Sequence, residues 1–530
     1  MTAKRERALV CALAVVLVLV RSFVATYYEG FYFDSDQAIV GLMARHLSRF
    51  QTFPLFYYGL NYMLGVEAWI IAPLFAVGRS SVQLARLPFV FLNAVVAVWL
   101  IDRLSVRNGV RPAVAFVAAL PFIVPTPAVS GQLLELAGSC VEPFVYVLLL
   151  WTVRRRPLAF GLLLAVAYLH REFTVFTLPA IVLVECWRRE FWTLETARRF
   201  GWMLAGFAIV WFVVDDLKMH LIGNGLIGQA ASLRGQMCTT LPELVPRVRA
   251  MAAEALPILY GGASMPIAAA RMRTPVVAGS WVTGVIVGVT LAVVVVRLAQ
   301  GVGRRFRVAG EPRNDPRPPV DIGRHGDQES RFPGNFGPSV RNDPRPLVEI
   351  GNDPRPPVEN GFGAYLALVG LFTALAYPLS CNVSLHTPPL LRYLLLALLL
   401  PIGCFVAFAQ RERSRAIRTV AITGFVLWAA MNLVDNVRLI RESLREAPFS
   451  EHRALVDYLL QQRIRYARAI YWDAYVIDFL SAERVITASV DIVRIPEYQK
   501  QVEEHAGAAV TLERQPCEGG TKVSAWCVTR

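Results

Sequence analysis

Long apolar stretches separated by mostly short polar loops dominate the chain. A membrane-spanning helix needs about 20 mostly apolar residues to cross about 30 Å of hydrocarbon, and eleven stretches meet or approach that length with few or no charges. These stretches are Ala8–Tyr27, Val82–Ile101, Pro112–Val129, Val141–Val153, Leu158–Leu169, Val175–Trp187, Phe200–Val214, Val276–Val296, Ala364–Leu379, Leu390–Ala409 and Thr419–Leu433. The pattern predicts an all-α polytopic membrane protein with about 11 transmembrane helices.

Composition and net charge narrow the class of protein further. Of the 530 residues, 55% are hydrophobic and only 18% are charged, which is typical of a polytopic membrane protein. The net charge of +14 is spread over alternating loops instead of being gathered on one soluble domain with interleaved aromatic residues. We therefore expect membrane lipids, and no nucleic acid, among the partners.

The distribution of Lys and Arg predicts the orientation in the membrane. Basic clusters at Lys4–Arg7, Arg154–Arg156 and Arg411–Arg418 alternate with loops 130–141 and 380–391, which contain neither residue type. By the positive-inside rule, the N-terminus is cytoplasmic and the C-terminus is exterior to the cell inner (plasma) membrane, because the number of spans is odd. A signal peptide is the alternative for the N-terminal run, but its removal would break the charge alternation and no clean small-residue cleavage site follows it.

Four longer segments interrupt the pattern of spans and short loops. They are the exterior segments Tyr28–Ser81 and Asp215–Pro275, the cytoplasmic stretch Arg297–Gly363 and the tail from Asp435 to Arg530. The tail alternates helix-like polar sequence with short apolar runs, which predicts a small α/β unit. We expect a transmembrane domain over residues 1–434, with exterior loop 28–81 and cytoplasmic linker 297–363, and a small exterior C-terminal domain over residues 435–530.

The cytoplasmic stretch contains an internal repeat. NDPRPPVDIG, NDPRPLVEIG and NDPRPPVENG occur at Asn314–Gly323, Asn342–Gly351 and Asn352–Gly361. A repeat this short and this rich in proline cannot bury a core, so we interpret it as an extended or disordered linker. A proline-motif docking site is the alternative.

The eight cysteines show no CxxC spacing that would indicate a zinc site or a redox motif. Cys517 and Cys527 lie in the predicted exterior tail, where a disulfide is permitted.

The first exterior segment carries the most informative polar residues. Apolar residues recur at helical spacing after Asp36, with polar residues on the other face, so an amphipathic helix is expected on the membrane surface. Asp34 and Asp36 mark its N-terminus, where one of them is expected to act as an ordinary helix cap. Polar aromatic, amide and acidic residues suited to a sugar and a phosphate follow, although an interfacial aromatic belt would also supply the aromatic ones: Tyr57, Tyr58, Asn61, Tyr62 and Glu67.

Several motifs resemble the polytopic glycosyltransferases of the GT-C fold. FDSDQAIVGLMARHL, PLFYYGLNYMLGVEAW and SVQLARLPF follow one another in the first exterior segment and the start of the second span, LLRYLLLALLLP surrounds Arg392, and YWDAYVIDFLSAERVI lies in the tail. The sequence looks closest to the bacterial branch that includes the Rgt-type lipopolysaccharide core glycosyltransferases, with kinship to aminoarabinose transferases and protein O-mannosyltransferases. The resemblance covers most of the chain through the order of its motifs.

The resemblance implies a GT-C-like membrane domain and a periplasmic C-terminal domain. It further implies an inverting glycosyltransferase that moves a sugar from a polyprenyl-phosphate donor to a lipid, glycan or protein acceptor on the outer face. In that family the first exterior loop carries an acidic motif, often Asp-Glu, whose Asp serves the acceptor. The matching pair here is Asp36-Gln37, so Asp36 inherits the role, and Asp34 or Glu67 replaces the second carboxylate.

Such a transfer needs a base for the acceptor hydroxyl and positive charge for the departing phosphate. Asp36 supplies the base. Arg392 with Tyr393, at the outer end of the tenth span, and the cluster His170-Arg171-Glu172, between the fifth and sixth spans, are the expected substrate-binding groups, together with Tyr58 and Asn61.

Structural roles are the alternatives for these groups. Arg392 and Tyr393 would also anchor a helix end in the lipid headgroups, and an Arg–Glu pair near His170 would satisfy itself. Glu135 and Glu142 flank another exterior loop as weaker candidates. No metal-ligand spacing is visible, and a divalent cation such as Mg or Mn, held by acidic side chains and phosphate oxygens, is left open as a cofactor.

A transporter or flippase of a lipid-linked sugar is the main alternative function. Transporters concentrate polar groups near the bilayer midplane and frequently consist of two related halves. This chain has few charges within its spans, no visible halves and large exterior loops. A non-catalytic scaffold is a further alternative, against which only the acidic loop argues.

Overall fold

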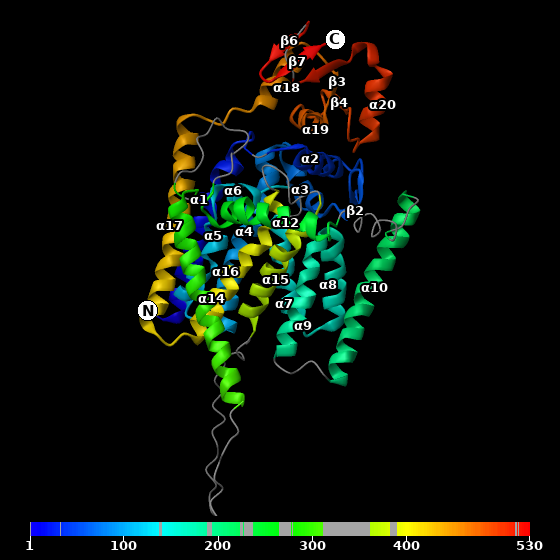
Figure 1. Ribbon diagram of the computed structural model, residues 1–530. Coiled ribbons are helices and arrows are strands. Elements are labelled where there is room, and N and C mark those ends of the chain that lie inside the picture. Colours follow the sequence, from blue (N-terminus) through cyan, green and yellow to red (C-terminus); the bar gives the residue numbers. More distant parts are fainter. Residues whose placement is uncertain are drawn as a thin grey trace, which may run out of the picture.

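The computed structural model describes residues 2–31, 33–136, 140–187, 193–222, 226, 237–263, 277, 279–310, 361–381, 390–514, 517 and 519–530, without the side chains of residues 61 and 301–310. The repeats at 314–361 lie outside this description, apart from residue 361, so the predictions made for them remain predictions. Within the described residues the chain is mostly helical, with a bundle of apolar helices and a small domain containing a sheet (Figure 1).

Each of the eleven predicted spans coincides with a helix of the bundle. These helices are α1 (Ala3–Tyr27), α4 (Val82–Asp102), α5 (Pro112–Ile123), α7 (Glu142–Val153), α8 (Pro157–His170), α9 (Thr177–Trp187), α10 (Leu194–Ile222), α14 (Trp281–Gly310), α15 (Phe362–Ala376), α16 (Leu399–Arg411) and α17 (Arg415–Arg445). By length and composition, six described helices could cross a membrane: α1, α4 with its extension η1 (Arg103–Arg107), α10, α14, α15 with η4 (Tyr377–Leu379), and α17. The chain is thus a multi-pass helical protein.

The other five predicted spans are shorter helices with 11 to 14 residues each. Proline explains one of the interruptions. The predicted span Pro112–Val129 ends as α5 at Ile123 and resumes as α6 (Pro127–Gln132), because Pro125 and Pro127 lack the amide hydrogen and disfavour a helical residue before them. Short 3-10 turns extend others: η2 (Glu172–Phe176) precedes α9, and η5 (Leu391–Tyr393) and η6 (Leu395–Leu398) precede α16.

The first exterior segment folds as α2 (Ser35–Ser48), a small hairpin of β1 (Phe56–Tyr57) and β2 (Leu60–Leu64), and α3 (Val66–Val77). The amphipathic helix α2 is present, but part of its polar face is covered instead of facing water. Arg45 has 0% exposure, and its Nη2 donates to the carbonyl of Phe479 at 2.8 Å. A Cβ on Gly41 would lie 2.5 Å from the Phe479 ring, so only glycine permits this approach. The C-terminal domain therefore packs directly on α2.

The C-terminal domain contains a five-stranded mixed sheet with the strand order β4-β3-β5-β7-β6. Strand β3 is parallel to β4 and β5, and β7 is antiparallel to β5 and β6. Its elements are α18 (Glu451–Gln461), β3 (Tyr466–Ala469), α19 (Tyr471–Leu480), β4 (Ile486–Ser489), α20 (Pro496–Glu504), η7 (Ala506–Ala508), β5 (Val510–Glu513), β6 (Thr521–Val523) and β7 (Trp526–Thr529). The small α/β unit is confirmed. Helix α17 continues through Asp435 to Arg445, so this unit begins later than the predicted boundary between residues 434 and 435.

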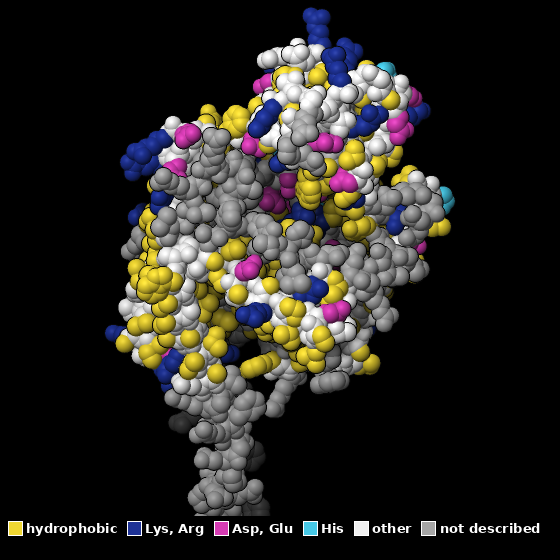
Figure 2. Space-filling view, turned by 45° about the horizontal axis from the view of Figure 1, so that its top comes forward, with side chains coloured by type: hydrophobic (Ala, Val, Ile, Leu, Met, Phe, Trp, Pro, Cys, Tyr) yellow, Lys and Arg dark blue, Asp and Glu magenta, His cyan; other side chains and the backbone are white. Residues whose placement is uncertain are grey.

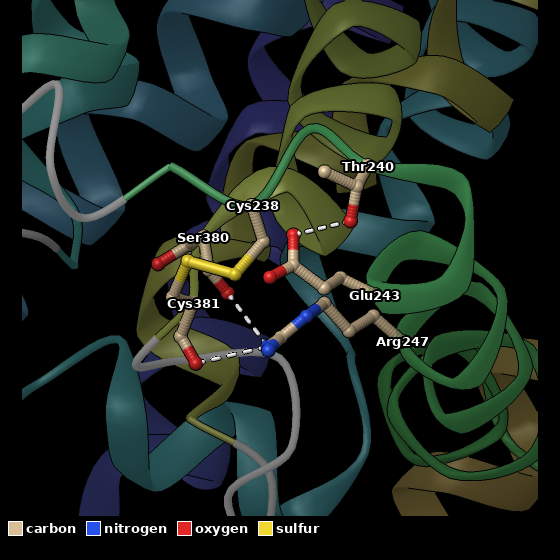
Figure 3. The surroundings of a disulfide bond; sticks show 6 residues. All are labelled: Cys238, Thr240, Glu243, Arg247, Ser380 and Cys381. Carbon is tan, nitrogen blue, oxygen red and sulfur yellow. Dashed lines mark hydrogen bonds between the residues drawn. A yellow bond between two sulfur atoms is a disulfide. The ribbon is translucent and has the colours of Figure 1, made fainter.

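The described residues contain two disulfides. Cys517 and Cys527 form the pair that the sequence permits. Cys238 and Cys381 form a second pair, which ties the segment before α12 (Leu241–Ala250) to the end of η4. Arg247 strengthens this connection, because its Nη1 donates to the carbonyl of Cys381 at 2.9 Å (Figure 3). Helix α12 continues through η3 (Met251–Ala255) and α13 (Leu256–Tyr260).

Candidate active site

The two aspartates at the start of α2 have different environments. Asp34 is the N-cap residue, and its carboxylate accepts from the backbone N–H of Gln37 at 3.0 Å. The carboxylate of Asp36 instead accepts from Nη1 of Arg392 at 2.9 Å and from the hydroxyl of Tyr471 at 2.5 Å. Asp34 is thus the capping residue, and Asp36 is the one that meets other parts of the chain.

Three distant segments meet at Asp36. Arg392 lies in η5 at the end of the bundle, and Tyr471 is the first residue of α19 in the C-terminal domain. Tyr57, from the hairpin after α2, donates its hydroxyl to the backbone carbonyl of Asp36 at 2.7 Å. The side chains of Asp36 and Arg392 retain 18% and 16% exposure, so solvent reaches both. In the space-filling view, acidic and basic side chains are visible in the recess below the C-terminal domain (Figure 2).

Arg392 keeps hydrogen-bonding capacity beyond its ion pair. Its Nε is buried and has no hydrogen-bond partner among the described residues. Its guanidinium carbon lies 5.3 Å from the centre of the Tyr393 ring. The side chain as a whole retains 16% exposure, so an anion that entered the recess would reach part of this guanidinium.

The carboxyl groups around Asp36 have divergent pKa values. Burial raises the pKa of Asp36, but the charge of Arg392 and the hydrogen bond from Tyr471 outweigh burial and hold it below its ordinary value. Burial and the charge of Asp36 raise the pKa of Asp34 to about 6. Burial, with the charge of Asp34, raises the pKa of Glu135 to about 8. Near neutral pH, the lowered pKa of Asp36 favours its ionised form, and the raised pKa of Glu135 favours its protonated form.

A second polar group surrounds His170, the last residue of α8. Its Nε2 lies 2.8 Å from the carboxylate of Glu67, and its Nδ1 lies 2.9 Å from the hydroxyl of Tyr146. Glu67 lies in the first turn of α3 and also pairs with Arg171, at 3.8 Å. The side chains of His170 and Glu67 are almost completely buried. Glu67 is thus engaged in a buried ion network, which makes it less suited than Asp36 to receive a proton from a substrate.

The two polar groups adjoin one another at Cys140. Burial raises the pKa of the Cys140 thiol, Glu135 and Glu142 raise it further, and Arg392 and Arg171 lower it. Glu142 is in direct contact with this residue, because its carboxylate accepts from the backbone N–H of Cys140 at 3.3 Å.

Tyr62 lies near two further predicted binding residues, Glu172 and Tyr393. Burial raises the pKa of its hydroxyl, as do the neighbouring Glu172 and Tyr393, while Arg494 and Arg171 lower it. Glu172 is half-buried in η2, and the ring of Tyr393 packs edge-on against Phe173 with 6.3 Å between ring centres. The structure therefore brings most of the predicted binding residues into one region.

Two predicted binding residues are not part of this arrangement. The hydroxyl of Tyr58 contacts Thr52 at 2.6 Å and Nδ1 of His46 at 3.1 Å. His46 in turn lies 2.8 Å from Glu483 of the C-terminal domain, so the contacts of Tyr58 belong to the junction between domains. The side chain of Asn61 lies outside the described residues.

Sequence reasoning missed Tyr471 and Arg494, which the C-terminal domain contributes. The motif that contains Tyr471 was visible, but nothing in its spacing indicates which residue faces the first exterior segment. Arg86 was also missed: on α4, its Nη2 donates to the side chain of Gln37 at 3.3 Å.

No group of three or more His, Cys, Asp or Glu residues in the described part of the chain is arranged to hold a metal ion. Both oxygens of the Asp36 carboxylate are engaged by Arg392 and Tyr471. A Mg or Mn ion held jointly with phosphate oxygens stays a prediction.

Comparisons with known proteins give distant likenesses only. No protein-family profile and no curated protein matches the chain. Among solved structures, the chain is similar to ArnT from Cupriavidus metallidurans bound to undecaprenyl phosphate, with a TM-score of 0.41, 12% identity and coverage of 98% of this chain and 97% of ArnT. It is also similar to the archaeal oligosaccharyltransferase AglB from Archaeoglobus fulgidus in complex with an inhibitory peptide and a dolichol-phosphate, with a TM-score of 0.46, 10% identity and coverage of 96% of this chain and 69% of AglB.

Likenesses at this level of identity and TM-score assign no activity or substrate to this chain. The resemblance of its motifs to the Rgt-type branch stays a prediction, and the function is judged from the residues of the site.

Proposed function

We propose that the chain is a membrane glycosyltransferase that transfers a sugar from a polyprenyl-phosphate donor to a lipid, glycan or protein acceptor on the exterior face of the cell inner membrane. The contact between Asp36 and Arg392 carries this proposal. It joins a carboxylate with a depressed pKa to a cation, at the end of the helical bundle and within reach of solvent. A base and a phosphate-binding cation are the two groups that the reaction requires.

In the proposed reaction, a hydroxyl of the acceptor attacks the anomeric carbon of the sugar and the bond from that carbon to the phosphate oxygen breaks. Asp36 accepts the hydroxyl proton, and the electron pair of the broken bond leaves with polyprenyl phosphate. Arg392, whose side chain retains 16% exposure, binds the departing phosphate through its guanidinium. One displacement of this kind inverts the configuration at the anomeric carbon.

The location of the site supports a reaction on the exterior face. Disulfides persist in oxidising compartments. One disulfide lies within the C-terminal domain, and the other adjoins α12, which Figure 1 shows toward the end of the bundle that faces this domain. This agrees with the alternation of basic loops, which assigns the C-terminus to the periplasm and makes a cell-envelope acceptor such as lipopolysaccharide accessible.

The experiment that tests the proposal uses purified protein in lipid nanodiscs. A panel of undecaprenyl-phosphate monosaccharides is supplied with a cell-envelope extract that retains its lipids, glycans and proteins, and the release of undecaprenyl phosphate is measured. We expect release from one or more donors by the wild type, none above background by Asp36→Asn, and normal release by Asp457→Asn, an exposed matched control on α18.

The alternative function gives a different result. A flippase would release no undecaprenyl phosphate, but in sealed proteoliposomes it would move the intact donor across the bilayer. That outcome would replace the transferase proposal.

A further inference from the structure

The hydroxyl of Tyr471 is the only contact with a side-chain oxygen of Asp36 that the described C-terminal domain makes. Tyr471 is 2% exposed, which leaves almost none of its ring to solvent. A buried phenol hydroxyl normally finds a polar partner, and here the partner is a charged carboxylate. The contact therefore joins the C-terminal domain to the proposed base itself.

Tyr471 is held from several directions. Its backbone N–H donates to Asp491 at 2.7 Å, and its carbonyl accepts from the hydroxyl of Ser35 at 2.5 Å. The guanidinium of Arg494 lies 5.6 Å from the ring centre, and the same residue donates to the carbonyl of Gly59 at 2.9 Å. Contacts with α2 and with the hairpin that follows it thus fix the phenol relative to the first exterior segment.

The two donors on Asp36 together define the orientation of its carboxylate. Tyr471 donates to Oδ1 and Arg392 donates to Oδ2. An ionised carboxylate offers about four acceptor positions, so each oxygen keeps one for a further donor. A carboxylate with one fixed donor on each oxygen cannot rotate without losing a charge-assisted hydrogen bond.

We propose that Tyr471 is a positioning residue for Asp36: its phenol orients the carboxylate toward the acceptor hydroxyl, so the C-terminal domain completes the active site. This inference rests on the proposed transferase function and deepens it. A hydrogen bond to the ionised form also stabilises that form, so Tyr471 keeps Asp36 able to accept a proton at lower pH. The other charged or titratable groups near Asp36 are Arg392, Arg494, Asp34, Glu135 and Tyr57.

The test compares wild type with Tyr471→Phe, which keeps the ring and removes the hydroxyl. With a donor that the wild type turns over, we expect kcat to fall about tenfold while KM for the donor is unchanged. We also expect the acid limb of the pH–rate profile to move up by about one unit, because the ionised form of Asp36 loses a donor. The protonation of Asp36 is followed independently by infrared difference spectroscopy against Asp36→Asn, and its midpoint should rise with the acid limb.

Matched variants separate positioning from a structural effect. Tyr498→Phe removes a comparable tyrosine–carboxylate hydrogen bond, to Glu483 at 2.7 Å, and should leave the acid limb in place. If Tyr471→Phe does not fold, Asp491→Ala loosens the backbone of Tyr471 and should move the acid limb in the same direction by a smaller amount.

If both proteins turn over and Tyr471→Phe has the same acid limb and the same infrared midpoint as the wild type, Tyr471 does not position Asp36. The proposed transferase function would still stand. No release of undecaprenyl phosphate by the wild type would overturn the transferase function and the positioning role of Tyr471 with it, whatever the infrared spectra show.

Discussion

The carboxylate of Asp36 and the guanidinium of Arg392 lie 2.9 Å apart, although 356 positions separate the two residues in the chain. In the absence of the polyprenyl-phosphate sugar, the charges of Asp36 and Arg392 neutralise each other. A donor phosphate would share this guanidinium with Asp36, and the weaker pairing would raise the proton affinity of Asp36. Donor binding would thus make Asp36 a better base as the donor enters the site.

Replacement of Asp36 by Asn is expected to lower the rate of transfer by at least about a hundredfold, in line with typical contributions of a general base. Asn keeps the shape of the side chain, so protein level and binding of the lipid donor should stay near the wild-type values. Asp34→Asn should lower the rate of transfer less, because Asn also caps helices well. If Asp36→Asn kept near-full turnover and Asp34→Asn or Glu67→Gln lost it, the base would be a carboxylate other than Asp36.

Replacement of Arg392 by Gln is expected to weaken the binding of undecaprenyl phosphate by roughly ten- to a hundredfold, the equivalent of one or two charge-assisted hydrogen bonds. The affinity of Arg392→Lys for undecaprenyl phosphate should lie between those of Arg392→Gln and the wild type, because Lys keeps the charge but not the planar set of N–H donors of Arg. Binding is measured by microscale thermophoresis of the protein in nanodiscs. The exposed Arg441 on the outer part of α17 supplies the control, Arg441→Gln, which should bind normally.

The stability of the C-terminal domain should fall in acid because of Asp473. Its carboxylate accepts from His452, Arg514 and Trp526, and these donors outweigh burial and lower its pKa to about 2. The unfolded chain has an ordinary pKa of about 3.9, so the stabilisation is complete above that pH and is lost as pH falls through the folded value. We expect a loss of about 2 kcal/mol in the free energy of unfolding between about pH 5 and pH 2.

Pulse proteolysis with pepsin measures this loss in the full chain, with cleavage scored in the C-terminal domain. Asp473→Asn should have a lower free energy of unfolding than the wild type near pH 5, and this free energy should fall less as the pH is lowered to 2. Glu483, whose pKa is also lowered to about 2, contributes in the same direction and is expected to leave some pH dependence in this variant. An equally steep loss in both proteins would show that Asp473 is not the responsible group.

The orientation in the membrane is tested by cysteine labelling. Glu504→Cys on exposed α20 should react with a membrane-impermeant maleimide in intact cells, and Ser339→Cys in the repeat region should react only after the membrane is opened. Labelling of both positions under the same condition would contradict the eleven-span topology.

Local sequence predicted the helices and the capping residue well, since these depend on neighbours in the chain. Apolar length located every helix of the bundle, and the N-cap preference identified Asp34 as a candidate cap. The sequence also indicated Asp36 and Arg392 separately, from a helix start and a span end. Their contact depends on how the bundle folds, and no local pattern reports it.

The contribution of the C-terminal domain could not be predicted for the same reason. Arg45 was expected on a polar face at the membrane surface, because amphipathic spacing does not distinguish water from a polar partner. Tyr471 reaches Asp36 across 435 positions of sequence. Cys238 and Cys381 likewise pair across 143 positions, with no spacing that indicates the bond.

The disulfide between Cys238 and Cys381 encloses α14, the proline-rich repeats and α15 in one covalent ring. A protease that cut the backbone within the repeats would therefore leave both fragments joined. With a cleavage site inserted near Ser339, the nicked protein should migrate as a single species on a non-reducing gel and as two after reduction. The two fragments would also retain the contact between Asp36 and Arg392, so the helical bundle should tolerate a break in its peptide backbone within the repeat region.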